Sequence, residues 1–201
     1  MLKKFTVLAT LLATLSLLVA CGNDDDTSAH ETATAASGEE SNDADVEFAT
    51  DMIQHHAQAL QMVDLTMRSD LDSEVRLLTE DIRAAQAPEI EQMTQWLTSW
   101  DQPIPETVRD HANAHGDGDM ESGPDMPGMM SDDQMSELEA ATGSEFQAMW
   151  LEMMVEHHQG AIEMAETEQS DGTFAPAIEL AESIESSQEK EIDTIEQLID
   201  S

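Results

Sequence analysis

Cysteine, basic residues and aromatic residues are all scarce in this 201-residue chain. The single cysteine excludes an intramolecular disulfide, so the hydrophobic core must stabilise the fold. Lysine and arginine total 7 against 44 acidic residues, and this balance excludes nucleic-acid binding, which needs a basic surface for phosphate contacts. Aromatic residues make up 3% of the chain and no alternating β-branched run is present, so no strand is predicted.

The N-terminal segment is typical of a bacterial export signal. Lys3 and Lys4 precede an apolar run that ends in Leu18-Val19-Ala20-Cys21. Residues 1–20 are therefore excluded from the predicted fold. The residues before Cys21 resemble a lipobox, which predicts a lipid on Cys21 and anchoring to the outer face of a bacterial membrane. An ordinary signal peptide with a chance cysteine is the alternative. Because the chain is acidic, membrane contact would depend on that lipid.

An internal duplication follows a predicted flexible acidic tether at residues 21–42. When the sequence is shifted by 102 residues, segment 48–97 aligns with segment 150–199 without a gap, and 12 positions match. The matches concentrate on a His-His-x-x-Ala motif and on a Gln-x-x-Glu-Ile motif. The first motif begins at His55 and again at His157, and this shared pattern indicates a duplicated unit.

Each copy predicts a helical hairpin. Helix-capping residues and a proline suited to a first helical turn place the hairpins at residues 43–100 and 144–200. A linker at residues 101–143 joins them, and Ser131 can cap a short helix within it. Two tandem hairpins predict an all-α four-helix bundle over residues 43–200. Pro88 lies inside a predicted helix and is expected to kink or break it.

Polar residues interrupt the apolar stripes of these helices. On a helical wheel, each histidine pair straddles the apolar stripe of the first helix in its copy. A glutamine and a glutamate lie within the apolar stripe of the second helix. A buried carboxylate is costly unless it is paired or bound to a metal. Two interpretations therefore stay open, a His–Glu hydrogen bond that fixes helix register and a metal site. The residues concerned are His55, His56, Gln86, Glu89, His157, His158, Gln188 and Glu191.

The linker is rich in histidine and methionine. Thioether sulfur favours Cu(I), and imidazole suits copper, zinc or iron. In a loop rich in Gly, Asp and Pro such residues are not explained as core, so they predict a copper-binding segment and are expected to contribute little packing. A low-complexity spacer is the alternative. The residues are His111, His115, Met120, Met126, Met129 and Met130.

Di-iron chemistry is a further alternative, because ferritin-like bundles bind two irons with Glu-x-x-His motifs. That motif is missing here, since no glutamate stands three residues before any of the four paired histidines. The residues at those places are Met52, Ile53, Met154 and Val155.

Segments "DMIQHHAQALQM", "MPGMMS" and "MMVEHHQGAIEMAE" resemble the bacterial DUF305 family, a domain of unknown function. The resemblance covers about residues 43–200. It implies a secreted or lipid-anchored protein with a ferritin-like bundle and a role in copper binding. Two departures are Ile195, where the family pattern tends to have methionine, and Pro88 within Gln-x-x-Glu. The motif positions predicted to support the ligands from outside the metal site are Gln86 and Gln188. The motif positions predicted as metal ligands are His55, His56, Met62, Glu89, Met93, Met154, His157, His158, Met164 and Glu191.

Together these features predict an extracytoplasmic copper-binding lipoprotein that buffers, sequesters or hands over the metal, in the form of Cu(I). No catalytic turnover is expected. Possible partners are a second copy of the chain or a protein that receives the metal. A helical interaction module without metal and a ferroxidase-like enzyme are the alternative functions.

Overall fold

The computed structural model describes residues 40–108 and 126–201, and the regular elements in these two ranges are helices. The all-α prediction is therefore confirmed. The helices are α1 (Asp43–Thr66), α2 (Ser73–Ser99), α4 (Asp132–Ala140), α5 (Gly143–Asp171) and α6 (Ala175–Ile199).

Local sequence signals begin several of these helices. Asn42 and Asp45 form a capping box at the start of α1, in which each side chain binds the backbone N–H of the other residue. Ser131 and Gln134 form the same motif at the start of α4. Pro176 lies in the first turn of α6, where its missing N–H leaves no hydrogen bond unmade.

Pro88 does not break α2, which continues to Ser99. An internal proline costs ~3 kcal/mol. Buried side chains lie on both sides of it, Ile82 and Gln86 before the proline and Met93 and Leu97 after it. The tertiary packing of this face outweighs the local penalty, because most helical stability in proteins comes from packing rather than from propensity.

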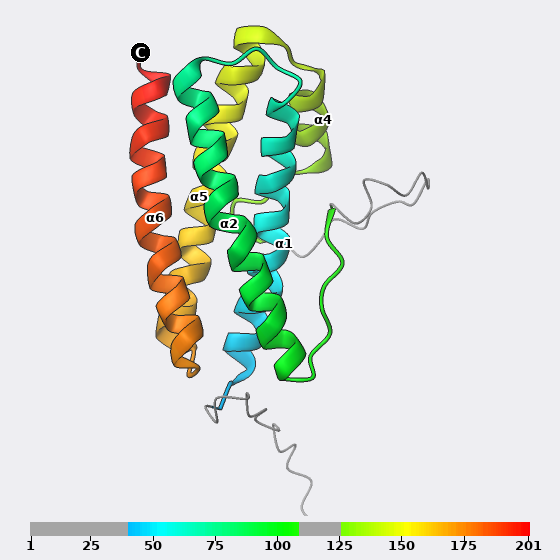
Figure 1. Ribbon diagram of the computed structural model, residues 1–201, viewed down its shortest axis with the longest axis vertical. Helices are drawn as coiled ribbons and strands as arrows, with labels where there is room; N and C mark the ends of the chain where they lie inside the picture. The colour runs from blue at the N-terminus through cyan, green and yellow to red at the C-terminus, as the bar shows by residue number, and fades with distance from the viewer. Residues whose placement is uncertain (1–39, 109–125) are drawn as a thin grey trace, which may run out of the picture. The chain divides into compact units, whose positions relative to one another are not determined.

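Two antiparallel hairpins, α1–α2 and α5–α6, pack together as a four-helix bundle (Figure 1). α1 packs against α5, α2 contacts α6, and the short α4 lies against α5. The histidine-bearing helices α1 and α5 are therefore direct neighbours. The glutamate-bearing helix α2 packs against α1, and the glutamate-bearing helix α6 packs against α5. No helix in the described part of the chain is long and apolar enough to span a membrane.

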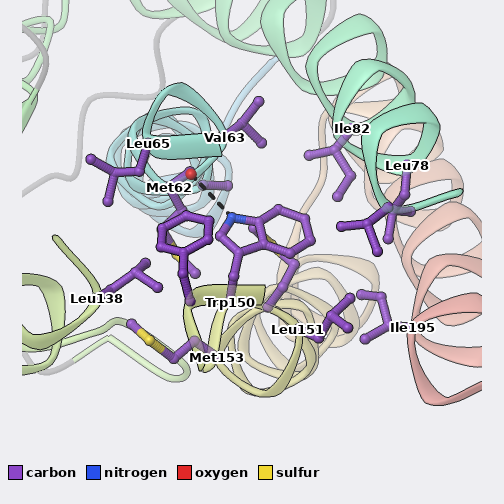
Figure 2. Close-up of a cluster of buried hydrophobic side chains, with 14 of the residues drawn as sticks. Met62, Val63, Leu65, Leu78, Ile82, Leu138, Trp150, Leu151, Met153 and Ile195 are labelled. Atoms are coloured by element: carbon purple, nitrogen blue, oxygen red, sulfur yellow. Dashed lines mark hydrogen bonds between the residues drawn. The ribbon is translucent and has the colours of Figure 1, made fainter. Parts of the chain in front are cut away.

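The apolar core consists of two clusters, which are related by the sequence repeat. One contains Trp150, Met154 and Ile195, and the other contains their repeat equivalents Phe48, Met52 and Met93. Within the first cluster, the Trp150 indole N–H donates to the Met62 carbonyl oxygen at 3.0 Å (Figure 2). The duplicated sequence thus folds with an approximate two-fold relation between its halves.

A buried carboxylate joins the two hairpins. Asp45 on α1 accepts hydrogen bonds from the backbone N–H groups of Thr173 and Phe174, at 3.1 and 2.9 Å, just before α6 begins. Glu168 on α5 is also buried. Burial, followed by the nearby carboxylate of Asp45, raises the pKa of Glu168 to about 9. Glu168 is therefore protonated at neutral pH. Because it carries no charge, its carboxyl group can lie close to the carboxylate of Asp45 between the two hairpins.

Candidate metal centre

All four paired histidines lie in the interface between α1 and α5 and are fully buried. The apolar stripes explain this placement, since each histidine pair takes the place of core residues on its helix. The four rings form two outer His–Glu pairs and one inner His–His contact.

The outer pairs are nearly identical in the two halves. His56 Nε2 lies 2.7 Å from Glu89 Oε2, and His158 Nε2 lies 2.6 Å from Glu191 Oε2. The glutamate side chains are 15% and 16% exposed, so each carboxylate sits at the edge of the bundle while its histidine is buried. Because a carboxylate accepts, Nε2 carries the hydrogen in both rings.

The inner contact joins the two halves directly. The rings of His55 and His157 have centroids 3.8 Å apart and are tilted by 42°. His55 Nε2 donates to the Pro127 carbonyl oxygen at 3.0 Å, whereas neither ring nitrogen of His157 meets a partner. Burial, and then the neighbouring histidines, lowers the pKa of His55 to about 3 and the pKa of His157 well below its usual value. Both rings are therefore neutral.

Buried ring nitrogens without hydrogen bonds distinguish this cluster from an ordinary polar core. The Nδ1 atoms of His55, His56, His157 and His158 all lack a partner in the described structure. His55, His56 and His158 place Nε2 against an acceptor, whereas His157 does not. A neutral ring that donates its Nε2–H keeps a lone pair on Nδ1. Metal-bound histidines usually show this arrangement, in which the second nitrogen donates to a carboxylate or a backbone carbonyl. The three fixed rings thus present imidazole donors of the kind that copper, zinc or iron bind.

The buried glutamines are also incompletely bonded. Gln86 makes no side-chain hydrogen bond, and Gln188 leaves its Oε1 unpaired. These residues were predicted to support the ligands from outside the metal site. Within residues 40–108 and 126–201, no group of three or more His, Cys, Asp or Glu side chains is arranged to hold a metal ion.

Residues Met126–Met130, here called the strap, cross over α1 and α5 beside the inner histidines. The Gln58 side chain holds the strap through two hydrogen bonds to the Met130 backbone, at 2.8 and 2.7 Å. On α5, the strap backbone lies so close to Gly160 that a Cβ there would overlap the Pro127 carbonyl group. Gly128 has a φ of 72°, a conformation that favours glycine.

The strap corrects one sequence prediction. Met126 and Met130 are buried at 8% and 4% exposure, and Met130 belongs to an apolar cluster. The expectation that the linker methionines contribute little packing is therefore wrong for these two residues. The docking of the strap backbone onto α1 and α5 carries their side chains into the core, while Met129 is only half-buried. His111, His115, Met120 and the predicted lipidation site Cys21 lie outside the described residues.

The helix methionines predicted as ligands lie in the apolar clusters of the bundle. Met62 and Met154 belong to the cluster around Trp150, and Met93 belongs to the cluster around Phe48. Met164 is half-buried and packs against the second cluster. Ile195 occupies the place equivalent to Met93 and is fully buried, so among the predicted ligands the two halves differ in one thioether.

An acidic groove of about 350 Å³ opens beside the strap. Its walls come from α1, α5 and the strap, and the wall residues include acidic groups on both helices and two thioethers. The carboxylates of this groove attract cations, with the exception of the protonated Glu168. The acidic and thioether residues that line it are Glu47, Asp51, Glu163, Glu168, Asp171, Met126 and Met164.

Sequence reasoning missed Gln58, Gly160 and the Pro127 carbonyl. A lone glycine in the middle of a strongly helical pattern was the available signal, because such a glycine often marks a close backbone approach. The identity of the approaching segment could not be read from the sequence.

The family profile of DUF305, a domain of unknown function, matches residues 45–199. The chain belongs to the DUF305 family. The duplicated motif, the bundle and the buried histidine cluster described above are therefore features of a member of this family.

Solved structures of similar fold support the assignment. A DUF305 protein from Streptomyces coelicolor is 33% identical, with a TM-score of 0.66 over 77% of this chain and 91% of that chain. A DUF305 fragment from Deinococcus radiodurans is 29% identical, with a TM-score of 0.66 over 79% of this chain and 97% of that chain. CopM in its Cu(I)-bound form is 23% identical, with a TM-score of 0.60 over 77% and 94% of the two chains. No curated protein matches the chain.

Proposed function

We propose that this protein binds copper, as Cu(I), outside the cytoplasm and serves to buffer, sequester or hand over the metal without catalytic turnover. The buried Nδ1 atoms of the four histidines carry the proposal. A purely structural His–Glu pair explains the Nε2 atoms of His56 and His158 but leaves the Nδ1 atoms unsatisfied, at a cost of ~1–3 kcal/mol for each buried group. A metal ion would use those lone pairs.

Ligand chemistry favours a soft ion. The described acidic and histidine side chains offer no three-ligand set, whereas thioethers lie in the strap and in both apolar clusters. Sulfur and imidazole together suit Cu(I) better than the harder divalent ions. The neutral state of His55 and His157 also helps, because a metal need not displace a proton from them at neutral pH.

The similar structures agree with this choice. CopM has been crystallised with Cu(I), with Cu(II) and with silver bound. The Streptomyces coelicolor relative is considered a secreted protein, in line with the export signal at residues 1–20. Anchoring through a lipid on Cys21 is part of the proposal, and changing Cys21 to Ala should release the protein from membranes. The acidic groove beside the strap would concentrate cations near the histidines.

The proposal is tested by metal analysis of the purified protein. After exposure to Cu(I) and removal of free metal, mass spectrometry should detect bound copper. The melting temperature should rise with copper, because a ligand that binds only the folded state stabilises it by ~2.7 kcal/mol at a hundredfold excess over Kd. Absence of both bound copper and a copper-dependent shift would contradict the proposal and favour a helical interaction module.

A further inference from the structure

One position of the repeat contacts the strap from both halves of the molecule. Gln58 on α1 and Gly160 on α5 are separated by 102 residues, the spacing of the duplication. They occupy the same place in the His-His-x-x-Ala motif, between the histidine pair and the alanine. The two copies have therefore diverged at the position where the strap docks.

Gln58 recognises the strap through its backbone. Its side-chain amide donates to the Met130 carbonyl oxygen and accepts from the Met130 N–H, so it pairs with a peptide group as another backbone segment would. Gln58 is only 4% exposed. Water cannot readily replace these two bonds, and loss of the side chain would leave buried backbone groups unpaired.

Gly160 on α5 leaves space for the strap backbone, which lies against the helix at this residue. A Cβ at Gly160 would overlap the Pro127 carbonyl and would lie 2.6 Å from the Gly128 Cα. In return, a Cβ at Gly128 would lie 2.6 Å from the Glu156 carbonyl oxygen. Only two glycines allow this backbone contact, since real Cβ atoms do not approach other atoms so closely.

The position of the strap decides which nitrogen of His55 is protonated. Its Pro127 carbonyl oxygen lies 3.0 Å from His55 Nε2. A carbonyl oxygen only accepts, so the hydrogen of the neutral ring must be on Nε2, and Nδ1 keeps its lone pair. His157 has no such partner and no fixed tautomer.

We propose that Gln58 and Gly160 are positioning residues of the candidate metal centre. They hold the strap so that Pro127 fixes the Nε2–H tautomer of His55, and so that Met126 and Met130 stay buried. This inference rests on the proposed copper function. It assigns the strap a defined part in preparing one histidine of the site for metal before any metal arrives.

Two variants remove the two contacts separately. Gly160→Ala should displace the strap by steric overlap with its backbone, although alanine favours a helix more than glycine does. Gln58→Leu should release the Met130 backbone while keeping an apolar side chain of similar size. Gln61→Leu is the matched control, because Gln61 lies one turn further along α1 and makes no hydrogen bond to the described strap. Far-UV circular dichroism verifies that each variant is folded.

The readout is the ¹H–¹⁵N spectrum of the histidine side chains in the metal-free protein, which separates protonated nitrogens from those with a lone pair. The wild type and Gln61→Leu should show His55 protonated on Nε2, with a slowly exchanging hydrogen. Gly160→Ala and Gln58→Leu should lose that protected signal. Their Cu(I) affinity, measured by competition with a chelator, should fall at least tenfold.

An unchanged His55 signal in both folded variants would overturn the inference, and so would a lost signal with wild-type Cu(I) affinity. Failure of the proposed function gives a different result. In that case the wild type itself binds no Cu(I), while the metal-free spectra still show whether Gln58 and Gly160 fix the tautomer of His55.

Discussion

The two halves of the molecule agree at the outer histidines and differ at the inner ones. The His56–Glu89 and His158–Glu191 pairs have nearly the same length and burial. In contrast, His55 donates to the strap, whereas His157 has no hydrogen-bond partner. The approximate two-fold symmetry therefore holds for the helices and is broken by the strap, which crosses both α1 and α5.

This difference teaches how a duplicated bundle becomes asymmetric. The strap contacts the same repeat position in both copies of the hairpin. It can accept a side chain from one copy only if the residue in the other copy is small enough to let the strap backbone approach. Gln58 and Gly160 satisfy these two requirements. The Met93 and Ile195 difference and the Thr66 and Glu168 difference follow the same pattern, in which the halves keep their shape and diverge in chemistry.

The largest loss of stability at constant pH should come from the outer pairs, where the comparison predicts equality. His56→Ala and His158→Ala each leave a partly buried glutamate without its partner, at a cost of about 1–3 kcal/mol. Urea denaturation of the metal-free variants measures both losses. Because the two pairs have the same geometry, the losses should agree within ~0.5 kcal/mol. A clear inequality would show that the halves are not equivalent even at these pairs.

Glu168 should make the stability of the protein depend on pH, whereas its repeat equivalent Thr66 carries no titratable group. The folded protein keeps a proton on Glu168 up to about pH 9, whereas the unfolded chain loses it near pH 4.5. The folded state therefore binds more protons in this window, and stability falls as pH rises, by up to ~1.4 kcal/mol per pH unit. Glu168→Gln should remove that slope. Melting temperatures at pH 5 and pH 8 measure it, and equal slopes in wild type and variant would contradict the assignment.

The inner histidines should respond to the same substitution with opposite signs. In the metal-free protein, His55→Leu removes a hydrogen bond and leaves the Pro127 carbonyl unpaired, so it should destabilise by ~1 kcal/mol. His157→Leu removes two buried unpaired nitrogens and should stabilise by a similar amount. Chemical denaturation of both variants tests this. Equal destabilisation would show that His157 has a partner after all.

The smallest stability change should come from substitutions at Met93 and Ile195, the equivalent positions of which only one carries a thioether. Both Met93 and Ile195 are fully buried, and swaps of similar volume cost less than ~1.5 kcal/mol. Met93→Ile should weaken Cu(I) binding, and Ile195→Met should strengthen it by making the halves alike. Competition titrations with a chelator measure both changes. If neither variant changes the affinity, the thioether at this position takes no part in the site.

Much of the fold could be predicted from the sequence because its signals are local. The capping residues, the apolar stripes and the 102-residue repeat indicate the helices and their pairing. The same stripes indicate that His55 and His157 are buried. Pro88 was misleading, because a local penalty was outweighed by packing on both sides of it.

The strap could not be predicted, because its position depends on contacts between distant parts of the chain. Met126 and Met130 stand in a sequence rich in Gly, Asp and Pro and have no periodicity, so nothing local indicates that they are buried. Their burial depends on Gln58 and Gly160, about seventy and thirty residues away in opposite directions. Likewise, sequence spacing predicts that His and Glu converge but not which nitrogen each carboxylate meets.

The central claim is that the buried imidazole nitrogens bind copper, and the most direct test is Cu(I) competition titration of wild type and His157→Leu at pH 7. His157 meets no hydrogen-bond partner, so its loss removes a possible metal ligand without breaking a structural bond. The account predicts that the wild type competes with the chelator and that the folded variant binds Cu(I) at least tenfold more weakly. Equal affinity in the two proteins would contradict it.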